Sequence, residues 1–218
     1  MTQHDEEDQP SVNQELQLSD SELNAHECSA TLAALLAHAA ALAHTRWTAA
    51  LSDALVGTMH KNAKWILAQA ICNSEADLKP YSNILAPALL RLVAETGDVI
   101  DDVVLLNGLH LDVIYTITNW NENSEISDKT CLNTTVEYLI ATCIQHRHMK
   151  SIYNTVLECL DRLLKLYGSA VNVPWRAFEK YFKDVPTDAS HYLQILQRIL
   201  KHNIHIPELV PTLLATFD

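Results

Sequence analysis

Glycine is scarce in this sequence, which contains only four glycines in 218 residues. β-Sandwiches, β-barrels and phosphate-binding loops use glycine wherever the backbone turns sharply or approaches another group closely. Helices joined by short turns need far less of it. The scarcity of glycine therefore predicts an all-α fold.

Paired cysteines and long apolar runs are also missing. The five cysteines are odd in number, widely spaced and without a C-x-x-C pair, which argues against a disulfide framework or a cysteine zinc site. The weakly polar stretch Ala30–Ala43 is alanine-rich and interrupted by His38, so it predicts neither a signal peptide nor a membrane span. We expect the chain to be cytoplasmic, nuclear or both, with no membrane partner.

The sequence carries none of the common catalytic motifs. It has no G-x-S-x-G, H-E-x-x-H, G-x-G-x-x-G or P-loop, which predicts that the protein is not an enzyme and needs no cofactor. Catalytic groups also assemble from distant residues, so an enzyme with a non-local site stays an alternative.

Histidines and aspartates provide the nearest candidates for metal ligands. His202 and His205, like His146 and His148, lack a third ligand at helical spacing, so we interpret them as surface or capping residues and expect no metal site. A second group of candidates consists of aspartates on an expected first helical turn, where they would complement the helix dipole: Asp98, Asp101 and Asp102.

Positive charge is absent from the N-terminal segment and concentrated near the other end. Residues 1–28 contain eight acidic residues and no Lys or Arg, whereas residues 145–205 contain nine Lys/Arg against five Asp/Glu. We expect 1–28 to form an acidic disordered tail and 29–218 a helical-repeat domain. The net charge of −12 argues against nucleic acid as a partner.

Apolar residues recur at helical spacing over most of the chain. The segment 150–167 has the clearest pattern, with Glu158–Arg162 and Asp161–Lys165 as i,i+4 pairs and Gly168 as its C-cap. Ser19 and Glu22 match a capping box. Val103–Trp120 is rich in β-branched residues, and we favour a buried helix there over a pair of strands.

Two helical segments share a short pattern. Cys159–Lys165 aligns with Ile195–Lys201 at an offset of 36 residues, including Arg162 with Arg198. The offset favours an internal repeat. Two amphipathic helices with a shared leucine stripe remain the other interpretation.

Three segments carry a family resemblance. Pro87–Val93 resembles the P-x-L-V-x-L-L helix of armadillo repeats, Ile206–Val210 resembles the start of another such helix, and Tyr115–Asn119 resembles the aromatic-x-x-x-Asn of an armadillo third helix. The resemblance implies an armadillo- or HEAT-like α-solenoid, in which the Asn would hold an extended peptide. A closed helical bundle is the alternative architecture.

These observations predict a non-enzymatic adaptor or scaffold that binds other proteins, with acidic or extended segments as its partners. A regulatory subunit of a larger complex, built as a bundle, is the second hypothesis.

Trp120 is the tryptophan that we expect to be exposed, since Asn119 and Asn121 flank it. The predicted protein-binding residues are a basic row and a second, aromatic and amide pair: Arg162, Lys165, Arg198 and Lys201, with Tyr115 and Asn119.

Overall fold

The computed structural model confirms the all-α class. It describes residues 19–42, 46–57, 60–100, 103–120, 126, 128–173, 189–202, 204, 206, 207 and 211. The helices and strands, in chain order, are α1 (Asp20–Asn24), α2 (Glu27–Ala41), α3 (Arg46–Val56), α4 (Lys61–Asn73), α5 (Glu75–Leu78), η1 (Lys79–Tyr81), α6 (Ser82–Thr96), β1 (Asp98–Ile100), β2 (Val103–Leu105), α7 (Gly108–Trp120), α8 (Lys129–Gln145), α9 (Lys150–Tyr167), η2 (Gly168–Ala170) and α11 (Ala189–Lys201).

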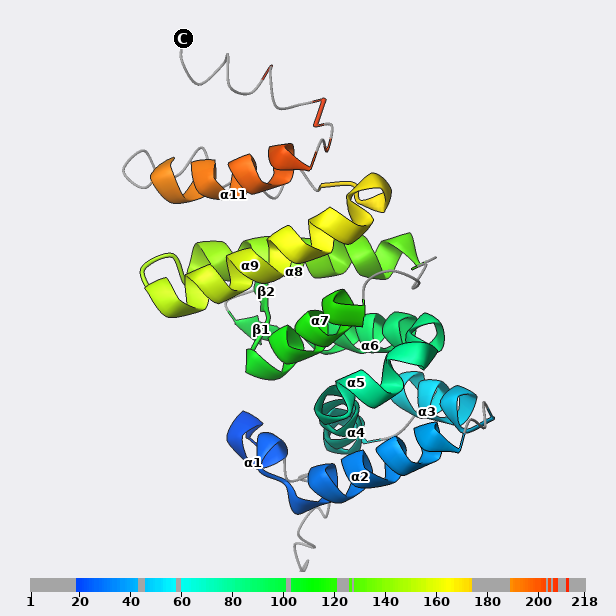
Figure 1. Cartoon of the computed structure of the whole chain (residues 1–218). Coiled ribbons are helices and arrows are strands. Elements are labelled where there is room, and N and C mark those ends of the chain that lie inside the picture. Colours follow the sequence, from blue (N-terminus) through cyan, green and yellow to red (C-terminus); the bar gives the residue numbers. More distant parts are fainter. Residues whose placement is uncertain are drawn as a thin grey trace, which may run out of the picture.

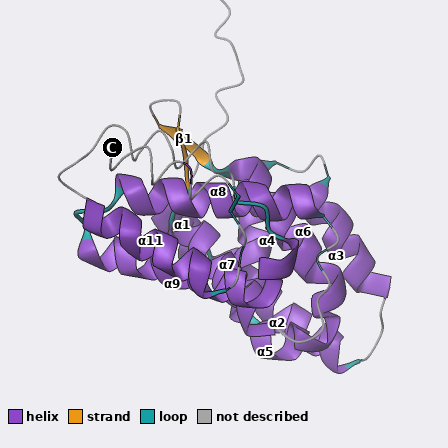
Figure 2. Ribbon diagram, turned by 90° about the horizontal axis from the view of Figure 1, so that it is seen from above, coloured by secondary structure: helices purple, strands orange, loops and turns teal. Residues whose placement is uncertain are grey.

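The helices stack in chain order from α2 at one end to α11 at the other (Figure 1). In one layer α3 contacts α6 and α6 contacts α8, while in the second layer α4 contacts α7 and α7 contacts α9. Helix α11 packs on both α8 and α9. Seen from above, the helices overlie one another and the two strands stand at one edge (Figure 2). The helices that pack against each other are therefore close in chain order, although many pairs, such as α2 with α4 and α3 with α6, are not consecutive.

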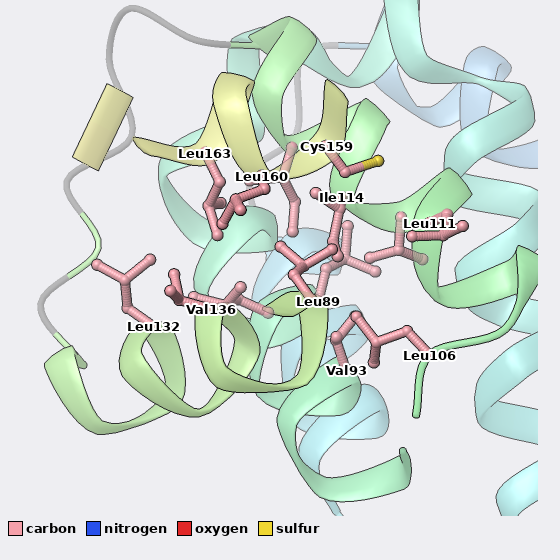
Figure 3. Packing of buried hydrophobic residues seen from close by; sticks show 14 of the residues in the cluster. Leu89, Val93, Leu106, Leu111, Ile114, Leu132, Val136, Cys159, Leu160 and Leu163 are labelled. Carbon is pink, nitrogen blue, oxygen red and sulfur yellow. The ribbon is translucent and has the colours of Figure 1, made fainter. Parts of the chain in front are cut away.

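A continuous apolar core joins these layers. Leu89 of α6, Ile114 of α7, Val136 of α8 and Leu160 of α9 are all fully buried, and their side chains converge between the four helices (Figure 3). Each comes from the apolar stripe of its helix, so burial of these stripes is the main favourable contribution to folding.

Several helix ends follow from local sequence. Ser19 and Glu22 form the predicted capping box at the start of α1. The side chain of Asp128 accepts hydrogen bonds from the backbone N–H groups of Thr130 and Cys131 and so caps α8. Gly168 ends α9, as predicted. Helix α1 and the start of α2 lie before the boundary proposed at residue 28, and residues 1–18 lie outside the described residues.

The prediction that Asp98 lies on the first turn of a helix was wrong. Asp98 does not begin a helix but lies in β1, which pairs antiparallel with β2 so that Val99 is opposite Val104. Gly97 ends α6 with φ −53° and ψ 144°, an extended conformation that stops the helix. Asp101 and Asp102 lie outside the described residues. The buried helix predicted over 103–120 forms only from Gly108 onward, because its β-branched first part pairs as a strand.

Pro87 is the first residue of the armadillo-like pattern at 87–93. It lies inside α6 and does not begin a helix. The helix begins five residues earlier, at Ser82. Of the similar pattern at 206–210, only Ile206 and Pro207 are described, and neither belongs to a described helix.

Trp120 was predicted to be exposed, and this is wrong. Its side chain is 1% exposed, and its Nε1 donates a hydrogen bond of 2.8 Å to the backbone carbonyl of Glu75. The polar neighbours in the sequence gave no sign that the last turn of α7 packs against the start of α5. Of the other tryptophans, Trp65 is buried, Trp47 is half-buried, and Trp175 lies outside the described residues.

Candidate protein-binding surface

Arg162 connects the exposed sides of α7 and α9. Its guanidinium carbon lies 4.5 Å from the centre of the Tyr115 ring, and its Nη1 donates a hydrogen bond of 2.7 Å to Oδ1 of Asn119. Within α9, its Nη2 lies 3.0 Å from Oε1 of Glu158, which confirms the predicted i,i+4 pair. The two groups of residues predicted from unrelated patterns therefore meet at Arg162.

Asn119 and Tyr115 are held in place by further polar contacts. The Asn119 amide donates to Oε2 of Glu75 over 3.3 Å, which extends the contacts to α5. Burial, followed by the hydrogen bond with Glu158, raises the pKa of Tyr115 to about 12. The phenol is therefore protonated at neutral pH, and its ring presents a neutral face to the guanidinium.

Asp161 joins α9 to α11. Its Oδ1 lies 3.0 Å from Nε2 of His202, 3.4 Å from Nζ of Lys201 and 3.6 Å from Nη1 of Arg198. Partial burial raises the pKa of Asp161, but the hydrogen bond with His202 and the charges of Lys201 and Arg198 outweigh it and hold the pKa below its ordinary value. Asp161 was predicted to pair with Lys165, and it turns to α11 instead.

Lys165 is exposed on the same surface. Its ammonium group makes no ion pair with the part of the chain that the structure describes. It lines a surface depression of about 330 Å³ between α7 and α9. The other residues that line this depression are Thr118, Asn119, Glu158, Asp161, Arg162 and Leu166.

The basic row of the sequence is therefore an exposed cluster that spans two helices. Four cations (Arg162, Lys165, Arg198 and Lys201) surround two carboxylates (Glu158 and Asp161). The side chains of Arg162, Arg198 and Lys201 remain 38%, 44% and 57% exposed. We call these six side chains, with Tyr115 and Asn119, the cationic cluster. Its excess of positive charge suits carboxylates or other anionic groups on a partner.

Sequence reasoning missed the acidic members of this surface that act between layers. Glu75 carries no motif, and Asp161 was assigned to an i,i+4 pair with Lys165. The contacts of both residues depend on which helix packs beside them. Glu158 was found because an i,i+4 pair lies within one helix.

The histidines that the sequence offered as candidate metal ligands lie at separate places in the structure. His146 is the C-cap residue of α8, His202 contacts Asp161, and His205 lies outside the described residues. Among the residues that the structure describes, no three His, Cys, Asp or Glu side chains gather as metal ligands would. None of the described helices has both the length and the apolarity needed to cross a bilayer.

Fold and surface together define an all-α protein whose helices stack in chain order, with charged side chains linking successive helices on one exposed side. The model of one protein family, described as "DNA-dependent protein kinase catalytic subunit, CC3", matches residues 1–125, which is more than half of the chain. The chain belongs to this family.

Individual relatives agree with the family match. The chain is 26% identical over 224 residues to the DNA-dependent protein kinase catalytic subunit of Gallus gallus, which covers 88% of this chain and 5% of that protein. It is 24% identical to the proteins of the same name from Canis lupus familiaris, over 212 residues, and Mus musculus, over 214 residues, with 87% of this chain and 5% of each relative covered. The chain thus spans about 5% of the length of the relatives that it matches.

Proposed function

We propose that this chain is a non-enzymatic scaffold segment that binds another protein through the cationic cluster. The observation that carries the proposal is the exposed excess of cations over carboxylates on α9 and α11, with Lys165 free of an ion pair among the described residues. An exposed positive surface of this kind attracts acidic segments and speeds their association.

We further propose that the stack is an armadillo- or HEAT-like solenoid. In support, α3, α6 and α8 contact one another in series, and so do α4, α7 and α9. Such stacks contact mainly their nearest neighbours and present extended surfaces. The partner of the cationic cluster is then an extended acidic segment that crosses several helices, which lie about 8–10 Å apart.

The relatives are named as catalytic subunits of a DNA-dependent protein kinase, but the chain spans only 5% of their length. A scaffold role within a larger assembly is therefore the part of their function that we propose for it, and we assign the chain to the nucleus, where the DNA of animal cells lies. The cytoplasm is the alternative location. The alternative functions are a regulatory subunit built as a closed bundle and an enzyme with a non-local site. X-ray scattering in solution separates an elongated solenoid from a bundle.

The test of the binding surface uses a fluorescein-labelled oligo-glutamate peptide and the variant Lys165→Glu. Lys165 has no partner to lose among the described residues, so the variant should fold normally and bind the peptide about fivefold more weakly, since an exposed ion pair contributes up to about 1 kcal/mol. The matched control is Lys150→Glu, an exposed lysine at the other end of the same helix.

Fluorescence polarisation at low and moderate salt gives the affinities. Salt should weaken the binding of the wild-type chain, because exposed charges are screened. Equal affinities for the wild-type chain and the Lys165→Glu variant, or an equal loss in the Lys150→Glu variant, would reject the cationic cluster as the site.

A further inference from the structure

A surface pocket of about 420 Å³ lies where the first turns of α7 and α9 meet the β1–β2 hairpin. Its lining is mainly apolar and comes from both strands and both helices: Ile100, Leu105, Leu106, Leu111 and Ile152. Ile100 is 49% exposed, whereas the three leucines are buried. A pocket of this size and lining accommodates a large apolar group. We call it the anchor pocket.

Three polar side chains in the wall of the anchor pocket already have partners within the protein. Asp98 accepts a hydrogen bond of 3.0 Å from Nδ2 of Asn107, and its other oxygen lies 3.8 Å from Nζ of Lys61. Oγ1 of Thr155 donates a hydrogen bond of 3.1 Å to the backbone carbonyl of Ser151. These pairings favour an apolar occupant over a charged one.

The anchor pocket and the depression in the cationic cluster lie along the same seam between α7 and α9. The two helices contact each other and run side by side (Figure 1). Leu111 and Ile152 line the anchor pocket, whereas Asn119 and Arg162 line the depression. The pocket therefore lies near the beginnings of the two helices, and the depression lies near their ends.

The spacing of the two sites suits one extended segment. Leu111 and Asn119 are eight positions apart in the sequence, which is about 12 Å along a helix. An extended chain covers this distance in about four residues, and side chains four positions apart on it point to the same side. One segment can therefore place one side chain in the anchor pocket and another on the cationic cluster.

The charge along this seam changes sign. Asp112 is exposed on α7 between the two sites. Partial burial raises the pKa of its carboxyl, and no cation among the described residues acts against this shift. Asp98 adds a second carboxylate at the anchor pocket. Acidic residues of a partner are therefore repelled beside the pocket and attracted at Arg162 and Lys165.

We infer that the anchor pocket and the cationic cluster bind one extended segment of a partner protein. The segment places a large apolar side chain in the pocket and, about four residues along, a run of acidic residues on the cluster. This inference rests on the proposed function and adds a second binding site to it. The order of the residues, and not only their charge, then decides which acidic segments bind.

Fluorescein-labelled peptides test the inference by fluorescence polarisation with the full 218-residue chain. One peptide has Trp, an uncharged Gly-Ser-Gly spacer and a run of glutamates, and it is made in both chain directions. In at least one direction it should bind about tenfold more tightly than the same peptide with Ala in place of Trp, because the pocket buries a large apolar side chain. A peptide of the same composition with Trp next to the glutamates should bind like the Ala peptide.

Two neighbouring residues of β1 provide a variant and its matched control. Ile100 lines the anchor pocket, whereas Val99, which is 69% exposed, does not, since adjacent side chains of a strand point to opposite faces. Ile100→Gln should remove most of the advantage of the Trp peptide and leave the affinity for the Ala peptide unchanged. Val99→Gln should change neither. The unchanged affinity for the Ala peptide also shows that the variants are folded.

Equal affinities for the Trp and Ala peptides in both directions, or equal effects of Ile100→Gln and Val99→Gln, would overturn the inference. Lys165→Glu separates this failure from that of the proposed function, because it should weaken both peptides if the cationic cluster binds them. Equal Trp and Ala affinities that both depend on Lys165 reject the anchor pocket alone. Binding that does not depend on Lys165, or no binding of either peptide, rejects both.

A photo-crosslinking amino acid in place of the peptide's Trp locates the apolar side chain. A crosslink to residues 98–111 or 146–155, the two segments that line the anchor pocket, supports the inference. A crosslink confined to other parts of the chain overturns it.

Discussion

Arg162 of α9 and Asn119 of α7 are joined by a hydrogen bond of 2.7 Å between Nη1 and Oδ1. The two residues are 43 positions apart in the sequence, and their contact crosses from one helical hairpin to the next. The same guanidinium also contacts Tyr115 and Glu158. Arg162 therefore contributes to the proposed binding surface and to the contact between layers, and the two roles lead to separate predictions.

Arg162→Ala should lower the free energy of unfolding by about 1 kcal/mol, since it removes a hydrogen bond to a charged group and a cation–π contact at a partly exposed site. Arg91→Ala is the matched control, because Arg91 forms an i,i+4 pair with Glu95 within α6. Loss of this solvent-exposed pair should lower the free energy of unfolding less than Arg162→Ala does. Urea denaturation measures both. A double-mutant cycle with Asn119→Ala should give a coupling of about 0.5–1 kcal/mol, and a coupling of zero would contradict the contact between layers.

Asp161→Asn should lower stability at neutral pH by roughly 1 kcal/mol, the upper range for an exposed ion pair, because the Asp161 carboxylate contacts three basic side chains near the end of α11. The pKa of Asp161 is lowered in the folded protein, so its contribution is complete above the unfolded value of about 3.9 and is lost as pH falls through the folded value. The stability difference between wild type and Asp161→Asn should therefore shrink below about pH 4. Urea denaturation at several pH values measures it, and a difference independent of pH would contradict the role of the carboxylate.

Trp120→Phe should destabilise the protein by about 1–3 kcal/mol. The change removes the donor to the Glu75 carbonyl at a buried position and leaves that acceptor without its partner. Trp47→Phe is the matched control, since Trp47 Nε1 is buried without a hydrogen-bond partner among the described residues. Removal of that unpaired donor should be neutral or stabilising. Thermal unfolding of the two variants compares them, and equal losses would argue against the Trp120–Glu75 bond.

Gly97→Ala should destabilise the junction between α6 and the β1–β2 hairpin by about 1–3 kcal/mol, because a Cβ there would clash with Cγ1 of Val104 and lie 3.3 Å from the ring of Tyr138. Gly108→Ala is the matched control, since a Cβ at Gly108 meets no atom within 4 Å. At the first residue of α7 this change should be neutral or slightly stabilising. Denaturant titration distinguishes the two, and a tolerated Gly97→Ala would contradict the close approach of the hairpin.

Local patterns were predicted well where one segment contains all the interacting residues. The Ser19–Glu22 capping box, the end of α9 at Gly168 and the Glu158–Arg162 pair each lie within a few residues. The interpretation failed at Trp120 and at Asp98. The burial of Trp120 depends on Glu75, which is distant in the sequence. The strand conformation of Asp98 depends on the pairing of β1 with β2.

The sequence by itself determined that this protein is helical, because sparse glycine and apolar residues at helical spacing act within each segment. It also identified the cations and the Tyr115–Asn119 pair as candidates. Only the tertiary structure decided that these side chains meet around Glu158 and Asp161, because the packing of α7, α9 and α11 brings together residues about 40 positions apart.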